Sequence, residues 1–115
     1  MDIEVRQVGQ ALIVKPLAKR VDYGNASVLK GAMVDYINRN HVRIAVDLSE
    51  VEFMDSSGLS ALLSTLKTVS RQGRMVVFGV NLNVGKLFSI TKLDKGVFEI
   101  HASESQAVSS LSETR

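Results

Sequence analysis

The octapeptide Phe53-Met54-Asp55-Ser56-Ser57-Gly58-Leu59-Ser60 determines how the rest of the chain is interpreted. It lies between an apolar run that predicts a β-strand and an amphipathic stretch that predicts an α-helix. Two hydroxyls and one carboxylate therefore stand where a strand ends and a helix begins. The backbone N–H groups of a first helical turn have no partners inside the helix, and the helix dipole favours negative charge there.

Hydrophobic periodicity predicts the elements on both sides of this stretch. Leucines and one valine recur at helical spacing after it, at 59, 62, 63, 66 and 69, and we assign this stripe to the core. The expected strands lie at 3–8, 11–14, 43–48, 75–80 and 97–100, and the expected helices at 26–38, 57–71, 83–90 and from 103 onward. Gly9-Gln10 joins the first two strands in a β-hairpin, which Pro16 ends. Asn83 and Ser103 are the expected caps of the last two helices.

This order predicts an α/β fold. Strands that alternate with helices imply right-handed crossovers and a mostly parallel sheet, to which the N-terminal hairpin adds antiparallel pairing. We expect one domain over residues 1–115, with a mixed, mostly parallel central sheet and about four helices. The serine-rich tail is expected to fray from about Ser109.

Composition argues against several classes of function. The net charge is only +2, and two tyrosines, four phenylalanines and no tryptophan leave few rings to stack on bases, so we expect no direct nucleic-acid binding. No apolar run approaches the roughly 20 residues that cross a bilayer. The chain has no cysteine, and its first residues lack a signal-peptide pattern. We expect a cytoplasmic protein, a monomer or weak dimer, without membrane contact.

The chain offers few catalytic or metal-binding residues. His41 and His101 both lie at predicted strand edges, and neither has a pair of further ligands near it in sequence. No nucleophile elbow, Walker loop or dinucleotide fingerprint is present. We therefore expect neither an enzyme nor a metal site nor a cofactor.

The Asp55-Ser56-Ser57-Gly58 segment has a structural interpretation and a functional one. In the structural one, Asp55 or a serine caps the helix, worth about 1 kcal/mol, and Gly58 lets the backbone turn. Asp22 likewise has the position of a cap for the helix that begins near Gly24 or Asn25. The functional interpretation rests on redundancy, because two serines and an aspartate are more than capping requires.

The segment Asp47-Leu48-Ser49-x-Val51-x-Phe53-Met54-Asp55-Ser56-Ser57-Gly58-Leu59 closely resembles the signature of the STAS domain family, specifically the bacterial anti-sigma-factor antagonists. The resemblance extends over nearly the whole chain. It includes the stretch from Leu17 to Asp22, the strand that follows Gly73, and the later Val84-x-x-Leu87-Phe88. One departure is Lys19, where the family often has glycine.

The resemblance implies a phosphorylation switch. In that family the unmodified antagonist binds an anti-sigma factor that is also a serine kinase, and so releases a sigma factor. The kinase phosphorylates the second serine of the motif, which is Ser57 here, and a phosphatase removes the phosphate. The implied partner-binding residues are Asp22, Asp55, Ser56, Ser57 and Gly58.

Three other functions remain open at this level. The chain could serve as a STAS subunit of another assembly, such as a stressosome-type scaffold or a lipid-transport accessory protein. It could be an enzyme with Ser57 as nucleophile, which needs a general base within hydrogen-bond reach. It could also bind a nucleotide, although the sequence has no glycine-rich loop.

Overall fold

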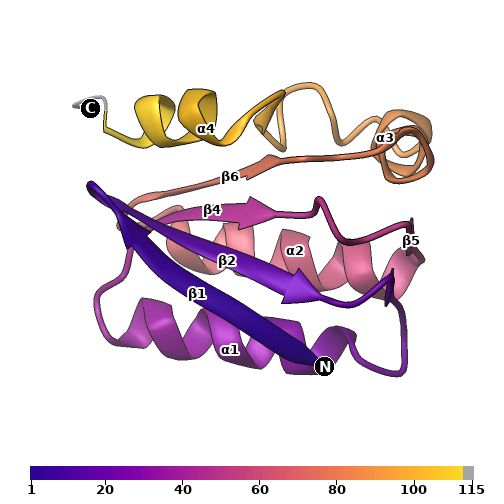
Figure 1. Ribbon diagram of the computed structural model, residues 1–115, viewed down its shortest axis with the longest axis horizontal. Helices are drawn as coiled ribbons and strands as arrows, with labels where there is room; N and C mark the ends of the chain where they lie inside the picture. Colours follow the sequence, from indigo (N-terminus) through magenta and orange to yellow (C-terminus); the bar gives the residue numbers. More distant parts are fainter. Residues whose placement is uncertain (113–115) are drawn as a thin grey trace.

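The computed structural model describes residues 1–112 as one α/β domain (Figure 1). The elements in chain order are β1 (Asp2–Val8), β2 (Ala11–Leu17), β3 (Arg20–Val21), α1 (Ala26–Asn38), β4 (Arg43–Asp47), β5 (Phe53–Met54), α2 (Ser56–Val69), β6 (Arg74–Phe78), α3 (Leu82–Ile90), β7 (Ile100–His101) and α4 (Glu104–Leu111). The expected fold class, with its N-terminal hairpin and four helices in the described part, is confirmed.

A five-stranded sheet forms the centre of the domain. Its order is β1-β2-β4-β6-β7, in which β1 and β2 are antiparallel and the remaining pairs are parallel. The hairpin turn is made by Gly9, whose φ of 58° is a left-handed conformation that glycine adopts without steric cost. Because the parallel strands point the same way, the loops that follow them gather at one edge of the sheet.

Two hydrophobic clusters lie on opposite faces of this sheet. Alternation along β4 sends Ile44 and Val46 into the larger cluster and Ala45 into the smaller one. Helices α1 and α2 pack side by side over the larger cluster, to which α3 also contributes (Figure 1). Helix α4 covers the smaller cluster across β4 and β6.

A second, small sheet pairs β3 with β5 in parallel, and periodicity did not predict it. Arg20 lies opposite Phe53, and Val21 lies opposite Met54. Each strand has only two residues, too few for any alternation to show. This pairing places the segment before α1 against the start of α2, and it therefore positions the candidate site.

Two predicted boundaries are wrong, one at the end of strand β2 and one at the start of helix α3. Strand β2 runs through Pro16 to Leu17, where Pro16 lies opposite Ile3 of β1; pairing of β2 with β4 already ends at Val14, so Pro16 stands where β2 is paired on one side only. The cap of α3 is Asn81, whose side chain accepts a hydrogen bond from the backbone N–H of Val84; Asn83 lies inside the helix.

The last part of the described chain also differs from expectation. Strand β7 begins only at Ile100, because Phe98 turns inward and packs against the ring of Phe88 at 5.2 Å. The Ser103 cap is confirmed. The tail does not fray from Ser109, since α4 continues to the fully buried Leu111; residues 113–115 of the expected frayed tail lie outside the described part.

Candidate functional site

The start of α2 forms the centre of the candidate site, as the octapeptide predicted. Asp55 is the N-cap, and its Oδ1 accepts hydrogen bonds from the backbone N–H groups of Ser57 at 2.8 Å and Gly58 at 3.2 Å. The capping interpretation of Asp55 is therefore confirmed. Two of the partnerless donors of the first turn are satisfied by one carboxylate oxygen.

The second oxygen of the same carboxylate binds a different segment. Asp55 Oδ2 accepts from the backbone N–H of Tyr23 at 3.2 Å. Tyr23 lies in the loop between β3 and α1, and it is 32 residues away in sequence. Asp55 thus joins the loop before α1 to the first turn of α2.

Asp22 does not cap α1 with its side chain. Its Oδ1 accepts from the backbone N–H of Gly24 at 3.0 Å, and Asn25 occupies the N-cap position. Asn25 Oδ1 in turn accepts from the backbone N–H of Asp22 at 2.9 Å. These two bonds fix the shape of the loop, in which Asp22 is half-buried.

Gly58 is needed for space, and not for a turn as the sequence suggested. It lies inside α2 and is buried. A Cβ at this position would lie 2.6 Å from Met54 Cγ and 2.8 Å from the carbonyl oxygen of Val21. Only glycine lets α2 approach the β3–β5 pair this closely. Its burial means that Gly58 shapes the site and offers little surface for direct contact.

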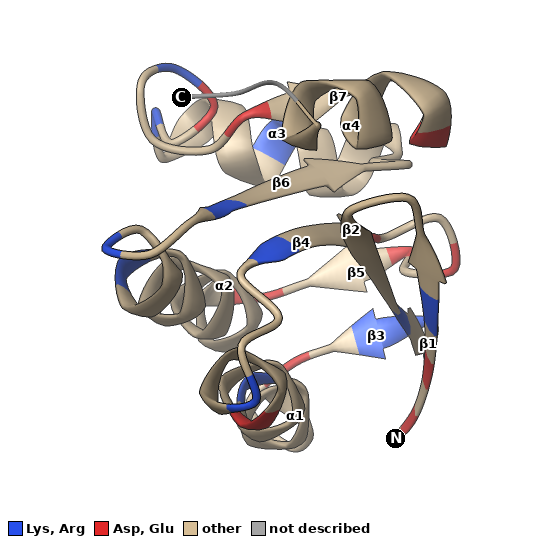
Figure 2. Ribbon diagram, turned by 90° about the vertical axis from the view of Figure 1, so that its left-hand side faces the viewer, with Lys and Arg blue, Asp and Glu red and all other residues tan. Residues whose placement is uncertain are grey.

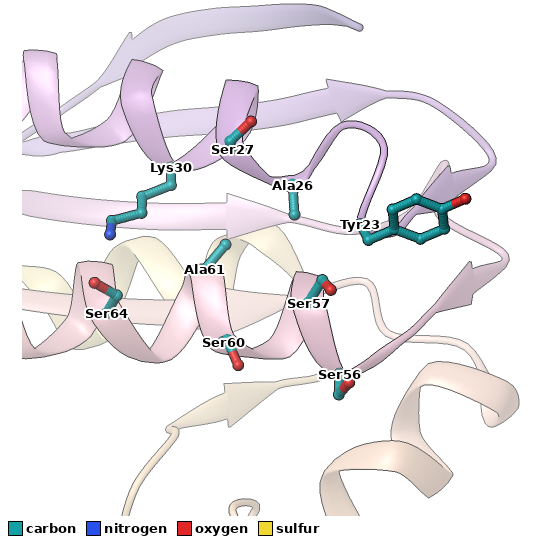
Figure 3. Close-up of a pocket in the computed structure, with 9 residues that line it drawn as sticks. All are labelled: Tyr23, Ala26, Ser27, Lys30, Ser56, Ser57, Ser60, Ala61 and Ser64. Atoms are coloured by element: carbon teal, nitrogen blue, oxygen red, sulfur yellow. The ribbon is translucent and has the colours of Figure 1, made fainter.

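Ser56 and Ser57 differ in their surroundings. Ser56 is exposed, whereas Ser57 is half-buried. Both line an open groove of about 480 Å³ between the first halves of α1 and α2 (Figure 3). The groove is lined by Tyr23, Ala26, Ser27, Lys30, Ser56, Ser57, Ser60, Ala61 and Ser64. The Ser57 hydroxyl is therefore reachable from outside the molecule.

Several residues of this site escaped the sequence interpretation. Tyr23 is 86% exposed at the mouth of the groove. The guanidinium of Arg20 lies 4.3 Å from the centre of the Phe53 ring, and its Nε lies 3.6 Å from Asp22 Oδ2. In Figure 2 the acidic segments that follow β3 and β5 lie next to this basic position of β3. Of these residues, only Lys30 could be placed from the sequence, as a charged residue on the polar side of a predicted amphipathic helix.

The two histidines lie away from the groove. His41 packs edge-on against Tyr36 at 5.6 Å, and His101 Nε2 lies 2.6 Å from Glu99 Oε2. Neither is among the residues that line the groove beside Ser57. Within residues 1–112, no group of three or more histidine, cysteine or acidic side chains has the arrangement of a metal site.

The pKa of the Glu99 carboxyl group lies below its ordinary value. Burial alone would raise the pKa of Glu99, but hydrogen bonds from His101 and Arg74 and the charge of Arg74 together lower it. Arg74 also donates to the carbonyl of Ser110 at 2.6 Å, so this cluster joins β6 and β7 to the end of α4. None of these residues lines the groove beside Ser57, and we assign the cluster a structural role.

No helix in the described chain is both long and apolar enough to cross a membrane.

Comparison with known proteins gives consistent results. The family model described as the STAS domain matches residues 2–107. The anti-sigma-B factor antagonist of Listeria monocytogenes is 31% identical over 94 residues, which cover 81% of this chain and 82% of the relative. The anti-sigma F factor antagonist of Paenibacillus polymyxa is 30% identical over 113 residues, covering 96% of this chain and 95% of the relative.

The fold is also shared with solved structures. The crystal structure of an anti-sigma factor antagonist from Mycobacterium paratuberculosis superposes with a TM-score of 0.88 at 21% identity, over 97% of this chain and 94% of that one. At this identity the likeness shows a common fold.

Proposed function

Because the chain belongs to the STAS domain family, we propose that it is an anti-sigma-factor antagonist controlled by phosphorylation of Ser57. In its unmodified form it binds an anti-sigma factor that has serine-kinase activity. The phosphorylated form no longer binds, and a phosphatase restores the free hydroxyl. The protein would act in the cytoplasm, where sigma factors and ATP are found.

Two relatives at 30% identity or more, which together span most of the chain, support this proposal through the activity in their names. The structural observation that carries it is the place of Ser57. Its hydroxyl lines an open groove in the first turn of α2, and Asp55 holds the Asp22 loop beside it. A modification there changes the surface of two segments at once.

The modification is a phosphoryl transfer from ATP. The Ser57 Oγ forms a bond to the γ-phosphorus while the bond between that phosphorus and the bridging oxygen of the β-phosphate breaks. ADP leaves, and the hydroxyl proton is lost to a base of the kinase or to solvent. The phosphatase reverses the state by hydrolysis, in which water replaces Oγ at phosphorus and inorganic phosphate is released.

The physical effect of the phosphate differs for the fold and for the complex. It adds about −1.5 to −2 charge and three acceptor oxygens. At a helix N-terminus the dipole offsets part of that charge, so the domain itself tolerates it. A partner surface that packs over Ser57 must instead desolvate the dianion. An unmatched buried charge costs several kcal/mol, and every 1.4 kcal/mol is about tenfold in affinity.

In the proposed partner surface, some residues contact the partner and others hold those residues in place. Asp22, Ser56 and Ser57 have side chains at the surface or half-buried, and we assign direct contacts to them. Asp55 acts mainly by holding the loop, and Gly58 by allowing close packing. We propose that this surface acts by binding a partner, with Ser57 as the residue that the partner modifies.

The test is phosphorylation in vitro. The chain is incubated with ATP and the kinase-type anti-sigma factor of the same genome, and the modified residue is located by peptide fragmentation in a mass spectrometer. We expect one phosphate, on Ser57, and no modification of the Ser57→Ala variant. A phosphate on Ser56 or elsewhere would disprove the assignment. A separate pull-down from the source cell addresses the alternative: capture of a transporter ATPase or a scaffold protein in place of a kinase would favour another STAS assembly.

A further inference from the structure

The groove between α1 and α2 contains one charged side chain. Among the nine residues that line it, Lys30 alone carries a charge, and five of the others are serines. We propose that Lys30 is the residue that binds the phosphate of phosphorylated Ser57 within the groove. This inference rests on the proposed function, because it concerns the modified state of the same serine.

Lys30 is available for this role in the unmodified protein. It is exposed, and it forms no ion pair with any other residue in the part of the chain that the structure describes. The neighbouring cation Arg20, by contrast, is already placed over the Phe53 ring and beside Asp22. Within residues 1–112, the Lys30 ammonium therefore has no ion pair to give up when it binds a phosphate in the groove.

The charges around Ser57 favour a phosphate that points toward Lys30 and away from the nearby carboxylates. Asp55 lies at the N-cap of α2, and Asp22 and Tyr23 lie in the loop before α1. Both carboxylates receive backbone N–H groups, yet they remain negative neighbours that repel a dianion. The groove side offers hydroxyl donors and the Lys30 ammonium, so the phosphate is expected to turn toward it.

The two helices are arranged so that the pair can meet. Helices α1 and α2 pack side by side and both start at the same edge of the sheet (Figure 3). Lys30 lies one turn after Ala26 on α1, and Ala61 lies one turn after Ser57 on α2. In the unmodified protein Lys30 extends toward Ser64, on the side away from Ser57.

The lysine side chain is a flexible four-carbon stem that ends in three donors, so it can change direction within the groove. Turning it toward the helix N-termini is the direction that long helical side chains commonly take. The resulting contact is a charge-assisted hydrogen bond between two helices. It would occupy the groove with the protein's own groups, so that a partner finds this surface filled as well as charged.

The experiment uses the full chain with phosphoserine incorporated at position 57 during translation, so that no kinase is needed. The second ionisation of the phosphate is followed by ³¹P NMR between pH 4.5 and 8 at low salt, since this group titrates near pH 6. Four proteins are compared: the parent, Lys30→Gln, Lys30→Arg and Lys67→Gln. Lys67 is an exposed lysine of α2 outside the groove and is the matched control.

We expect the Lys30→Gln change to lower the second dissociation constant of the phosphate roughly threefold, because the neighbouring cation favours the dianion. Lys30→Arg should keep the parent value, and Lys67→Gln should change it little. The difference should shrink in high salt. Equal effects of Lys30→Gln and Lys67→Gln would overturn the inference.

The same samples separate this inference from the proposed function. If the phosphorylated parent loses partner binding but Lys30→Gln leaves the titration unchanged, the switch stands and the role of Lys30 is wrong. If the phosphorylated parent binds the anti-sigma factor as well as the unmodified chain does, the proposed function fails, whatever the titration gives. Circular dichroism of each variant confirms that the exposed substitutions leave the fold intact.

Discussion

The carboxylate of Asp55 hydrogen-bonds the backbone N–H of Tyr23 at 3.2 Å while it caps α2. One side chain therefore holds together the two segments that surround Ser57. The backbone N–H of Asp55 adds a second bond between them, which it donates to the carbonyl of Val21 at 3.2 Å, at the end of β3. The position of Asp22 relative to Ser57 thus depends on this carboxylate together with the β3–β5 pair.

Replacing Asp55 by alanine should destabilise the domain and loosen the Tyr23 loop. Loss of the cap costs about 0.5–2 kcal/mol, and loss of the second bond adds to it. Urea unfolding followed by circular dichroism measures the change. Asp55→Asn is the control, because asparagine is also a good cap; unfolding of Asp55→Ala at the parent's urea midpoint would contradict the role assigned to this residue.

Gly58 and Gly31 provide a matched pair of helix glycines. A Cβ at 58 would lie 2.6 Å from Met54 Cγ, whereas a Cβ at 31 meets nothing within 4 Å. Gly58→Ala should therefore destabilise by about 1–3 kcal/mol through overpacking. Gly31→Ala should stabilise by roughly 0.4–1 kcal/mol, since alanine restricts the unfolded chain and favours helix. Thermal unfolding of both variants checks this prediction: the melting temperature should fall for Gly58→Ala and rise for Gly31→Ala, and a shift in the same direction for both would contradict it.

Glu99 should make the domain less stable in acid. Its pKa is lowered in the folded protein from an ordinary 4.5 by its bonds to His101 and Arg74. A lowered folded pKa means that this stabilisation is fully present above the unfolded pKa and is lost as the pH falls through the folded value. The effect is modest because the carboxylate is partly exposed.

The melting temperature of the parent should therefore exceed that of Glu99→Gln above about pH 5. The two proteins should converge as the pH falls through the lowered folded pKa of Glu99, which lies below 4.5. A constant difference across this range would show that Glu99 stabilises by packing alone. Arg39, whose exposed ion pair with Asp35 lies on α1, offers an unrelated surface pair for comparison.

Local sequence patterns predicted the helices and the strands of the five-stranded sheet, whereas the site needed tertiary contacts. The hairpin at Gly9, the helix from Ala26 to Asn38 and the helix start at Asp55 follow from periodicity and capping chemistry, which act over a few residues. The choice of Asn81 over Asn83 as a cap depended on how far β6 extends, which no local signal fixes.

The missing parts of the site all join distant segments. The pairing of Arg20 with Phe53 and the bond from Tyr23 to Asp55 each span more than thirty residues. The groove exists only because α1 and α2 pack side by side, so its Lys30 looked like any solvated helix charge. Gly58 was interpreted as a turn residue because the close approach of Val21 is invisible in the sequence.

Ser57 provides the variants that test the partner surface. Ser57→Ala should bind the kinase-type anti-sigma factor about as tightly as the parent, because it removes one half-buried hydroxyl and adds no charge. Ser57→Asp should bind at least about tenfold more weakly, since it adds a carboxylate that the interface must desolvate. Isothermal calorimetry measures both. Ser60→Asp, on the same groove, is the control for a charge one turn further along α2.

The measurement that tests the central claim most directly compares two forms of the full chain, with serine or phosphoserine at 57, against the kinase-type anti-sigma factor of the same genome. Binding is measured by calorimetry at physiological salt. The account predicts tight binding of the serine form and a loss of at least about a hundredfold, or nearly 3 kcal/mol, for the phosphoserine form. Equal affinities of the two folded forms would contradict it.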